Sequence, residues 1–181
     1  MREQLQKDFK NIIKNLTLSQ KDIEIKKFCL DNFINKGFPN RKEEDWKFSD
    51  LNQIIKKNIG ELSFYCDYTS TNKVETSIFV DGLEHNKIVF INGRIEKIDF
   101  DYEKKNQIEI VDQSETINKF SNNNSLSDLN NAFTNKSFKI LVKNGYKLAK
   151  PLIIYHTSNS KIWSKNINLR LDFELEKDSS L

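Results

Sequence analysis

The sequence is poor in the residues that build disulfide frameworks and metal sites. Its 181 residues include only two cysteines and two histidines, with five glycines and two prolines. Cys29 and Cys66 stand far apart and belong to no short metal or redox motif, so neither a disulfide scaffold nor a cysteine metal site is indicated. No segment approaches the ~20 consecutive apolar residues of a membrane span, and the charged N-terminus lacks the apolar core of a signal peptide. These absences predict a cytoplasmic protein that does not enter a membrane.

The charge balance argues against a nucleic-acid partner. Twenty-nine basic residues face 26 acidic ones, which leaves a net charge of +3. The lysine pairs are scattered and lack the interleaved aromatic residues and concentrated charge of a nucleic-acid surface; they are Lys26-Lys27, Lys56-Lys57 and Lys104-Lys105. Thirteen phenylalanines and two tryptophans supply enough apolar surface for a folded core.

Residues 1–60 carry helical patterns. Apolar residues recur at helical spacing near the N-terminus, at Leu5, Phe9, Ile12, Ile13 and Leu16. Ser19 resembles the start of a capping box for a second helix, and Gly37 followed by Pro39 marks its end. A third, short helix is predicted with Ser49 as its N-cap and with three buried residues, Leu51, Ile54 and Ile55. We expect Gly60 to close this helical region.

Residues 61–181 are predicted to be rich in strands. After a polar connector at Asp67–Lys73, the apolar period changes to two, with expected strands at Ile78–Val80, Lys87–Ile91, Arg94–Phe100, Gln107–Val111, Phe138–Val142 and Leu152–Tyr155. Asn92-Gly93 is the strongest hairpin signal. A loop at Ser121–Ser125 precedes a short helix near Leu126–Phe133, and Asn144-Gly145 predicts another turn.

The last segment alternates most clearly. Its apolar face consists of Ile167, Leu169, Leu171, Phe173 and Leu175. A half-buried strand this close to the end of the chain would leave an unpaired edge, which invites aggregation. We therefore hypothesise that the sequence is a fragment of a longer protein.

Three segments carry a resemblance to a known family. Gly37–Leu51, which contains Arg41, Glu44 and Trp46, looks like the pattern Gly-x-Pro-Thr-Arg-x-x-Glu followed by Trp-Lys/Arg-Tyr-Thr-x-Leu. Val89–Arg94 resembles a Val-Phe-x-Asn-Gly-Arg hairpin, and Leu129–Phe133 resembles a Leu-Asn-x-Ala-Phe stretch. These patterns are those of the SufB/SufD family, and the Trp46 motif favours the SufD branch. The sequence departs from the family at Asn40, Phe48 and Ser49, where Thr, Tyr and Thr are usual, and at Lys136-Ser137, where Asp-Gly is common.

The resemblance implies a fold and a role. The fold would be α+β, with an N-terminal helical region at 1–60 and a strand-rich region at 61–181 that enters a right-handed β-helix, a solenoid of stacked repeats. The role would be that of a non-catalytic scaffold subunit in iron–sulfur cluster assembly. Its partners would be a SufB-like subunit and a SufC-like ATPase. The cluster and ATP are implied only for the full complex, so the segment itself is expected to bind no cofactor and to be no enzyme.

The candidate site residues have simple structural interpretations. Trp46, with Arg41 and Glu44 nearby, is read as packing an inter-helix loop onto the core, with partner docking as the functional alternative. Cys29 falls on an apolar helix face, where a free thiol behaves as a small hydrophobe. Neither Cys66 nor the histidines, His85 and His156, have spaced partners for a metal or cluster. Glu43-Glu44-Asp45 reads as a solvated turn rather than an acid–base pair.

Two alternatives from other classes remain open. The first is the N-terminal part of a β-helical carbohydrate-active enzyme or other binding protein, which would need clustered carboxylates on one solenoid face. The second is a basic RNA-binding module with a helical arm, which would show a steep salt dependence of RNA affinity. The sequence contains no Gly-rich phosphate loop, no Gly-x-Ser-x-Gly elbow and no His-Glu-x-x-His motif. No catalytic, cofactor-binding or metal-ligating residue is therefore assigned.

Overall fold

A computed structural model describes residues 2–58, 62–64, 73–113, 124–159, 162 and 165–181. The chain divides into two compact units, each built from three segments. Unit 1 consists of Met1–Cys66, Ser114–Asn135 and Ser164–Leu169. Unit 2 consists of Asp67–Gln113, Lys136–Trp163 and Arg170–Leu181.

Unit 1 begins with two helices whose ends match the sequence signals. They are α1 (Arg2–Lys14) and α2 (Gln20–Lys36). The Ser19 side chain accepts a hydrogen bond from the Asp22 backbone N–H, which confirms the predicted N-cap. At the other end the Gly37 N–H donates to the Phe33 carbonyl, and Gly37 has a φ of 72°, a conformation that glycine adopts without a steric penalty.

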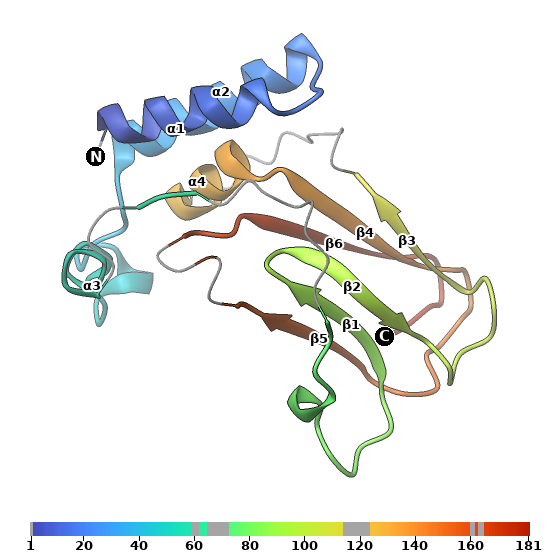
Figure 1. The fold of residues 1–181 in the computed structure, drawn as a ribbon. Helices are drawn as coiled ribbons and strands as arrows, with labels where there is room; N and C mark the ends of the chain where they lie inside the picture. Colours follow the sequence, from blue (N-terminus) through green and yellow to red (C-terminus); the bar gives the residue numbers. More distant parts are fainter. Residues whose placement is uncertain (1, 59–61, 65–72, 114–123, 160–161, 163–164) are drawn as a thin grey trace. The chain divides into compact units, whose positions relative to one another are not determined.

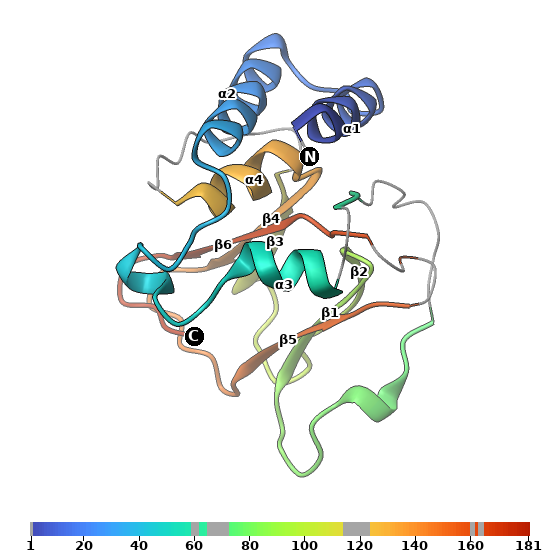
Figure 2. The ribbon, with the colours of Figure 1, turned by 90° about the vertical axis from the view of Figure 1, so that its left-hand side faces the viewer.

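A third helix, α4 (Ser125–Phe133), joins these two from much later in the sequence. Figures 1 and 2 both show α4 beneath the pair formed by α1 and α2. The three helices bury one apolar core, whose most buried members include Leu5, Ile12, Leu30, Phe33, Ala132 and Phe133. The ring of Phe133 stacks on that of Phe64, with centroids 3.6 Å apart, so the 62–64 segment is part of the same core.

The loop after Gly37 contains a 3₁₀ turn, η1 (Glu44–Trp46), and leads into α3 (Leu51–Asn58). The predicted Ser49 cap is wrong, because Asp50 Oδ1 accepts the Gln53 N–H at 3.0 Å. Ile54 was expected to be buried but is 45% exposed. The eight residues of α3 form only about two turns, which is too short for the apolar spacing to fix which residues face the core.

Unit 2 contains a three-stranded sheet in the order β2-β1-β5. Its strands are β1 (Asn86–Ile91), β2 (Arg94–Asp99) and β5 (Leu152–Thr157). β1 and β2 form the predicted antiparallel hairpin, and both turn residues have positive φ, 52° at Asn92 and 80° at Gly93. β5 pairs with the other side of β1 in the parallel direction. β1 is thus the central strand, and Ile88, Val89 and Phe90 are buried on its two faces.

The second sheet of unit 2 has the order β3-β4-β6. Its strands are β3 (Ile108–Asp112), β4 (Lys136–Val142) and β6 (Leu169–Leu175). β3 and β4 are antiparallel. Phe138, Ile140 and Val142 of β4 are buried, and Phe138 contacts Phe90 of β1 with ring centroids 5.8 Å apart. Aromatic packing therefore links the two sheets inside unit 2.

The prediction of a β-helix is wrong. The described part of the chain is α+β, with four α-helices and two small sheets of three strands each, and it forms no solenoid. A solenoid repeats parallel pairing from coil to coil, whereas both sheets here contain an antiparallel pair. The physical reason lies in the two-residue turn at Asn92-Gly93, which returns β2 directly alongside β1 and leaves no room for a coil.

Two further strand predictions need correction. Thr76–Ile78 forms a 3₁₀ turn, η2, instead of a strand, and Val80 is 49% exposed. β6 exists as predicted, but its apolar face is only partly covered, with Phe173 46% and Leu175 47% exposed. The alternation of apolar and polar residues therefore predicted the strand correctly, but it did not predict how much of the apolar face of β6 is exposed. Gly60, Cys66 and most of the Asp67–Lys73 connector and the Ser121–Ser125 loop lie outside the described residues.

Candidate functional site

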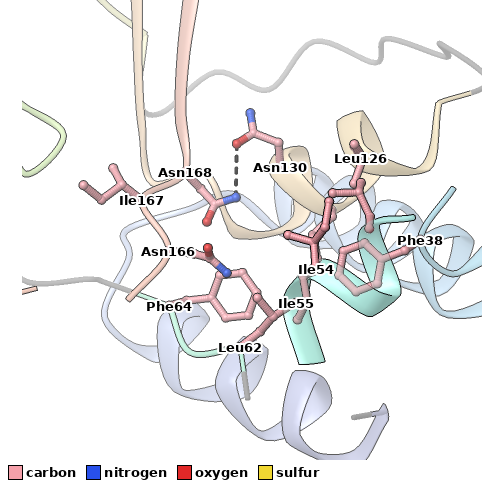
Figure 3. Close-up of a pocket in the computed structure, with 12 residues that line it drawn as sticks. Phe38, Ile54, Ile55, Leu62, Phe64, Leu126, Asn130, Asn166, Ile167 and Asn168 are labelled. Carbon is pink, nitrogen blue, oxygen red and sulfur yellow. Dashed lines mark hydrogen bonds between the residues drawn. The ribbon is translucent and has the colours of Figure 1, made fainter. Parts of the chain in front are cut away.

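The clearest candidate site is an apolar pocket of about 320 Å³ in unit 1. Figure 3 shows its lining residues, which come from five stretches of sequence. α3 contributes Leu51, Ile54 and Ile55, and α4 contributes Leu126, Leu129 and Asn130. The remaining wall comes from Phe38, Leu62 and Phe64 and from residues 166–168.

Backbone pairing holds two of these stretches side by side. Phe64 and Asn166 form an isolated parallel bridge, and the Asn166 N–H donates to the Ser63 carbonyl at 2.7 Å. Because Phe64 also stacks on Phe133, this pairing is anchored to the helical core. Phe38 is fixed in the same way by an edge-to-face contact with Phe33, with centroids 5.0 Å apart. The pocket therefore has firm walls on the core side.

The polar part of the lining consists of three asparagines. The Asn130 Nδ2 donates to the Leu169 carbonyl at 3.2 Å, and the Asn168 Nδ2 donates to Asn130 Oδ1 at 3.1 Å (Figure 3). Asn166 lies two residues before Asn168 and lines the same wall of the pocket. None of the described lining residues is charged or carries a nucleophile. This chemistry suits binding of an apolar group with a polar contact, rather than acid–base or nucleophilic catalysis.

A second unusual group in unit 1 is the buried Lys26 of α2. Its side chain is 2% exposed, and its Nζ donates to the Asn131 carbonyl at 3.2 Å and to the Thr134 carbonyl. These carbonyls belong to the C-terminal end of α4, which favours a cation. Burial lowers the pKa of Lys26 to about 8, although the nearby Cys29 and Asp22 act in the opposite direction.

Sequence reasoning missed Lys26, although a signal was present. Lys26 lies four residues after Asp22 and three before Cys29, so it falls on the same helical face as the buried Cys29 and Phe33. From the sequence, we considered the Lys26-Lys27 pair only as one of several scattered lysine pairs that do not form a nucleic-acid surface. The pattern of α2 places the first lysine inward and the second outward.

Unit 2 contains a buried His–Tyr pair. His85 is 2% exposed, and its Nδ1 lies 2.6 Å from the Leu83 carbonyl, which can only accept. Nδ1 therefore carries the proton, and the Tyr155 hydroxyl donates to Nε2 over 2.7 Å. The same hydroxyl accepts the Val80 N–H at 3.1 Å. The sequence offered no metal-ligand partner for His85, and the structure shows it as an interior hydrogen-bonding residue.

Glu103 is the centre of a second polar network in unit 2. It accepts hydrogen bonds from the Tyr146 hydroxyl at 2.7 Å, from Asn86 Nδ2 at 2.6 Å and from the backbone N–H groups of Ala149 and Lys150. Burial alone would raise the pKa of Glu103, but these hydrogen bonds outweigh it and lower the pKa below the ordinary value. The carboxylate fixes the loop before β5, which is a structural task.

The residues singled out from the sequence do not gather into one site. Trp46 is half-buried in η1, and Lys47 forms an ion pair with Glu44 at 2.5 Å. Arg41 is exposed. Phe48, two residues after Trp46, is 89% exposed, with the Lys47 ammonium 5.3 Å from its ring centroid.

The cysteine and histidine candidates are likewise dispersed. Cys29 is buried in the core of unit 1, as predicted, and Cys66 lies outside the described residues. His156 stacks on Phe90 with centroids 4.7 Å apart, and burial lowers its pKa. Within the described ranges, no group of three or more His, Cys, Asp or Glu side chains is placed to hold a metal ion.

Comparisons with known proteins give no assignment. No protein-family model matches the chain, and no curated protein matches it significantly. Among the helices described here, none combines the length and the apolar character needed to cross a membrane.

Proposed function

We propose that this chain is a SufD-like, non-catalytic scaffold subunit that assists iron–sulfur cluster assembly in the cytoplasm, together with a SufB-like subunit and a SufC-like ATPase. The observation that carries the proposal is the sequence resemblance in three separate segments. These are Gly37–Leu51, Val89–Arg94 and Leu129–Phe133. The proposal does not include a β-helix, and it assigns cluster chemistry and ATP hydrolysis to the partners.

The exposed end of the first segment supports a docking role. Phe48 is 89% exposed, so its ring is accessible for contact with a partner. Aromatic residues are enriched at protein interfaces, where burying one such side chain can dominate the binding energy. We therefore assign the docking contact to Phe48 rather than to the half-buried Trp46.

Co-purification tests the proposal. The full chain with an affinity tag is co-expressed with the SufB-like and SufC-like chains encoded in the same genome, and the captured subunits are identified by mass spectrometry. We expect both partners in stoichiometric amounts, and Phe48→Ser to reduce their recovery at least tenfold. Phe28→Ser is the matched control, because Phe28 is a 53% exposed phenylalanine on α2 outside the three segments.

The wild type tests the scaffold function, and the comparison of Phe48→Ser with Phe28→Ser tests the docking role of Phe48. If the wild-type chain captures neither partner, the scaffold function is refuted. If it captures both, but Phe48→Ser and Phe28→Ser behave alike, the scaffold function stands and the docking role of Phe48 is wrong.

A further inference from the structure

β6 is an edge strand of the second sheet in unit 2. One side of β6 pairs with β4, and none of the described strands pairs with its other side (Figure 1). The Glu176 N–H donates to the Val142 carbonyl of β4 at 3.0 Å. Because backbone groups alternate in direction along a strand, the N–H and C=O groups of Leu171 and Phe173 point to the open side. These groups form a template for one more strand.

The side chains of this edge combine apolar surface with charge. Phe173 is 46% exposed, although it lies on the apolar face of β6. The other face carries Arg170, Asp172 and Glu174. Charged residues on an edge strand normally discourage pairing, so they decide which strand can be added. The incoming strand must cover the apolar face and bring charges of opposite sign to the polar one.

The charge pattern matches a second copy of β6 in the antiparallel direction. Pairing centred on Leu171 places Arg170 opposite Asp172 of the second copy, and Asp172 opposite its Arg170. Opposite charges in directly facing positions stabilise a strand pair, and like charges destabilise it. Centring the pair on Asp172 or on Phe173 would place carboxylates opposite each other. A parallel copy in register would place every charge opposite an identical one.

The other edge of the same sheet lacks this complementarity. The charged residues of β3 are Glu109 and Asp112, which are both acidic, so β3 cannot form opposite-charge pairs with its own copy. On β6, the Leu169 carbonyl already accepts a hydrogen bond from Asn130 at 3.2 Å. A carbonyl oxygen has two lone pairs, so this bond leaves one for a facing N–H.

We propose that two copies of this chain associate through antiparallel pairing of β6 with β6, centred on Leu171. The two three-stranded sheets then form one sheet of six strands, and Phe173 of each copy packs beside Leu169 of the other. So short a contact is small for a protein interface, and the dimer is therefore expected to be weak and reversible. The inference does not depend on the proposed scaffold function, because it rests on β6 alone.

Sedimentation equilibrium of the full chain over a dilution series measures the mass and the dimer dissociation constant. We expect the mass to approach twice 21.3 kDa at high concentration. Arg170→Asp and Asp172→Arg each make both cross-strand pairs repulsive, so each should weaken the dimer by about tenfold or more. Glu109→Lys is the matched control, a charge reversal on β3, and should dimerise as the wild type does.

A mixture of the two single variants separates charge pairing from damage to the fold. Neither variant retains the ion pair of 3.0 Å that joins Arg170 to Asp172 within the wild-type strand. An acidic and a basic copy nevertheless carry opposite charges at both cross-strand positions, so we expect the mixture to form a heterodimer about as tight as the wild-type dimer. A wild type that is monomeric at every concentration overturns the proposal. A mixture that stays monomeric also overturns it, as do single variants that dimerise like the wild type, since the contact would then lie elsewhere.

Discussion

The buried Lys26 makes a distinctive prediction about stability at alkaline pH. Its pKa falls from the ordinary 10.5 to about 8 in the folded chain. Between these two values the unfolded chain binds a proton that the folded chain has released. The free energy of unfolding should therefore increase as pH rises from 8 to 10.5, and Lys26 should contribute no slope below pH 8.

The size of this effect follows from the pKa. At about 1.4 kcal/mol for each pH unit, a fall from 10.5 to about 8 corresponds to about 3 kcal/mol. Because the side chain is only 2% exposed, solvent screening does not reduce this value greatly. Lys26→Met keeps most of the apolar stem but removes the charge and the hydrogen bonds to α4, so its pH profile should lack the rise.

Urea unfolding of the wild type and of Lys26→Met between pH 7 and 10.5 measures the difference. Fluorescence of Trp46 reports on unit 1 when Trp163 is replaced by phenylalanine in both proteins. Other lysines and tyrosines titrate in both chains, so the difference between the two profiles isolates Lys26. Because Cys29 interacts electrostatically with Lys26, the pair of proteins is also compared in a Cys29→Ala background, which removes this contribution.

Two results would refute this reasoning. Parallel profiles would mean that the Lys26 ammonium has the same pKa in the folded and unfolded chains. A difference of opposite sign, with wild-type stability falling as pH rises, would mean that the α4 carbonyls stabilise the charge by more than burial costs.

The other predictions concern both units. Tyr155→Phe leaves His85 Nε2 buried without a donor, so the free energy of unfolding should fall by about 1–3 kcal/mol in urea; no change would contradict the assigned tautomer. The lowered pKa of Glu103 makes the wild type lose stability as pH falls below 4.5. Glu103→Gln should therefore show a smaller fall in the thermal unfolding temperature between pH 7 and pH 3. An equal fall in both proteins would contradict this prediction. Trp46→Ala should lower the free energy of unfolding by less than the about 3–5 kcal/mol expected for a fully buried tryptophan. Phe48→Ala should lower it by less than about 0.5 kcal/mol. Calorimetry that found the larger loss for Phe48→Ala would contradict the burial of these two side chains.

Local signals in the sequence predicted local structure well. The Ser19 cap, the Gly37 stop and the Asn92-Gly93 turn each depend on one or two residues with a definite conformational or hydrogen-bonding preference, and all three are confirmed. The helix near Leu126–Phe133 was also predicted, since its apolar residues repeat at helical spacing.

The pairing of segments that lie far apart in the sequence could not be predicted from such local signals. β5 pairs with β1 across about sixty residues of sequence, and nothing in either strand specifies its partner. The β-helix was expected because of family resemblance, and the antiparallel pairs overturn it. The pocket was missed for the same reason, because its lining brings together distant segments such as Asn130 and Asn168, 38 positions apart.

The most direct test of the scaffold proposal is the mass of the assembly in solution. The purified full chain is mixed with purified SufB-like and SufC-like proteins from the same genome and separated by size exclusion with in-line light scattering. We predict a single peak whose mass includes all three chains and which persists on dilution to micromolar concentration. Elution of the 21.3 kDa chain on its own, at every ratio of the partners, would contradict the account.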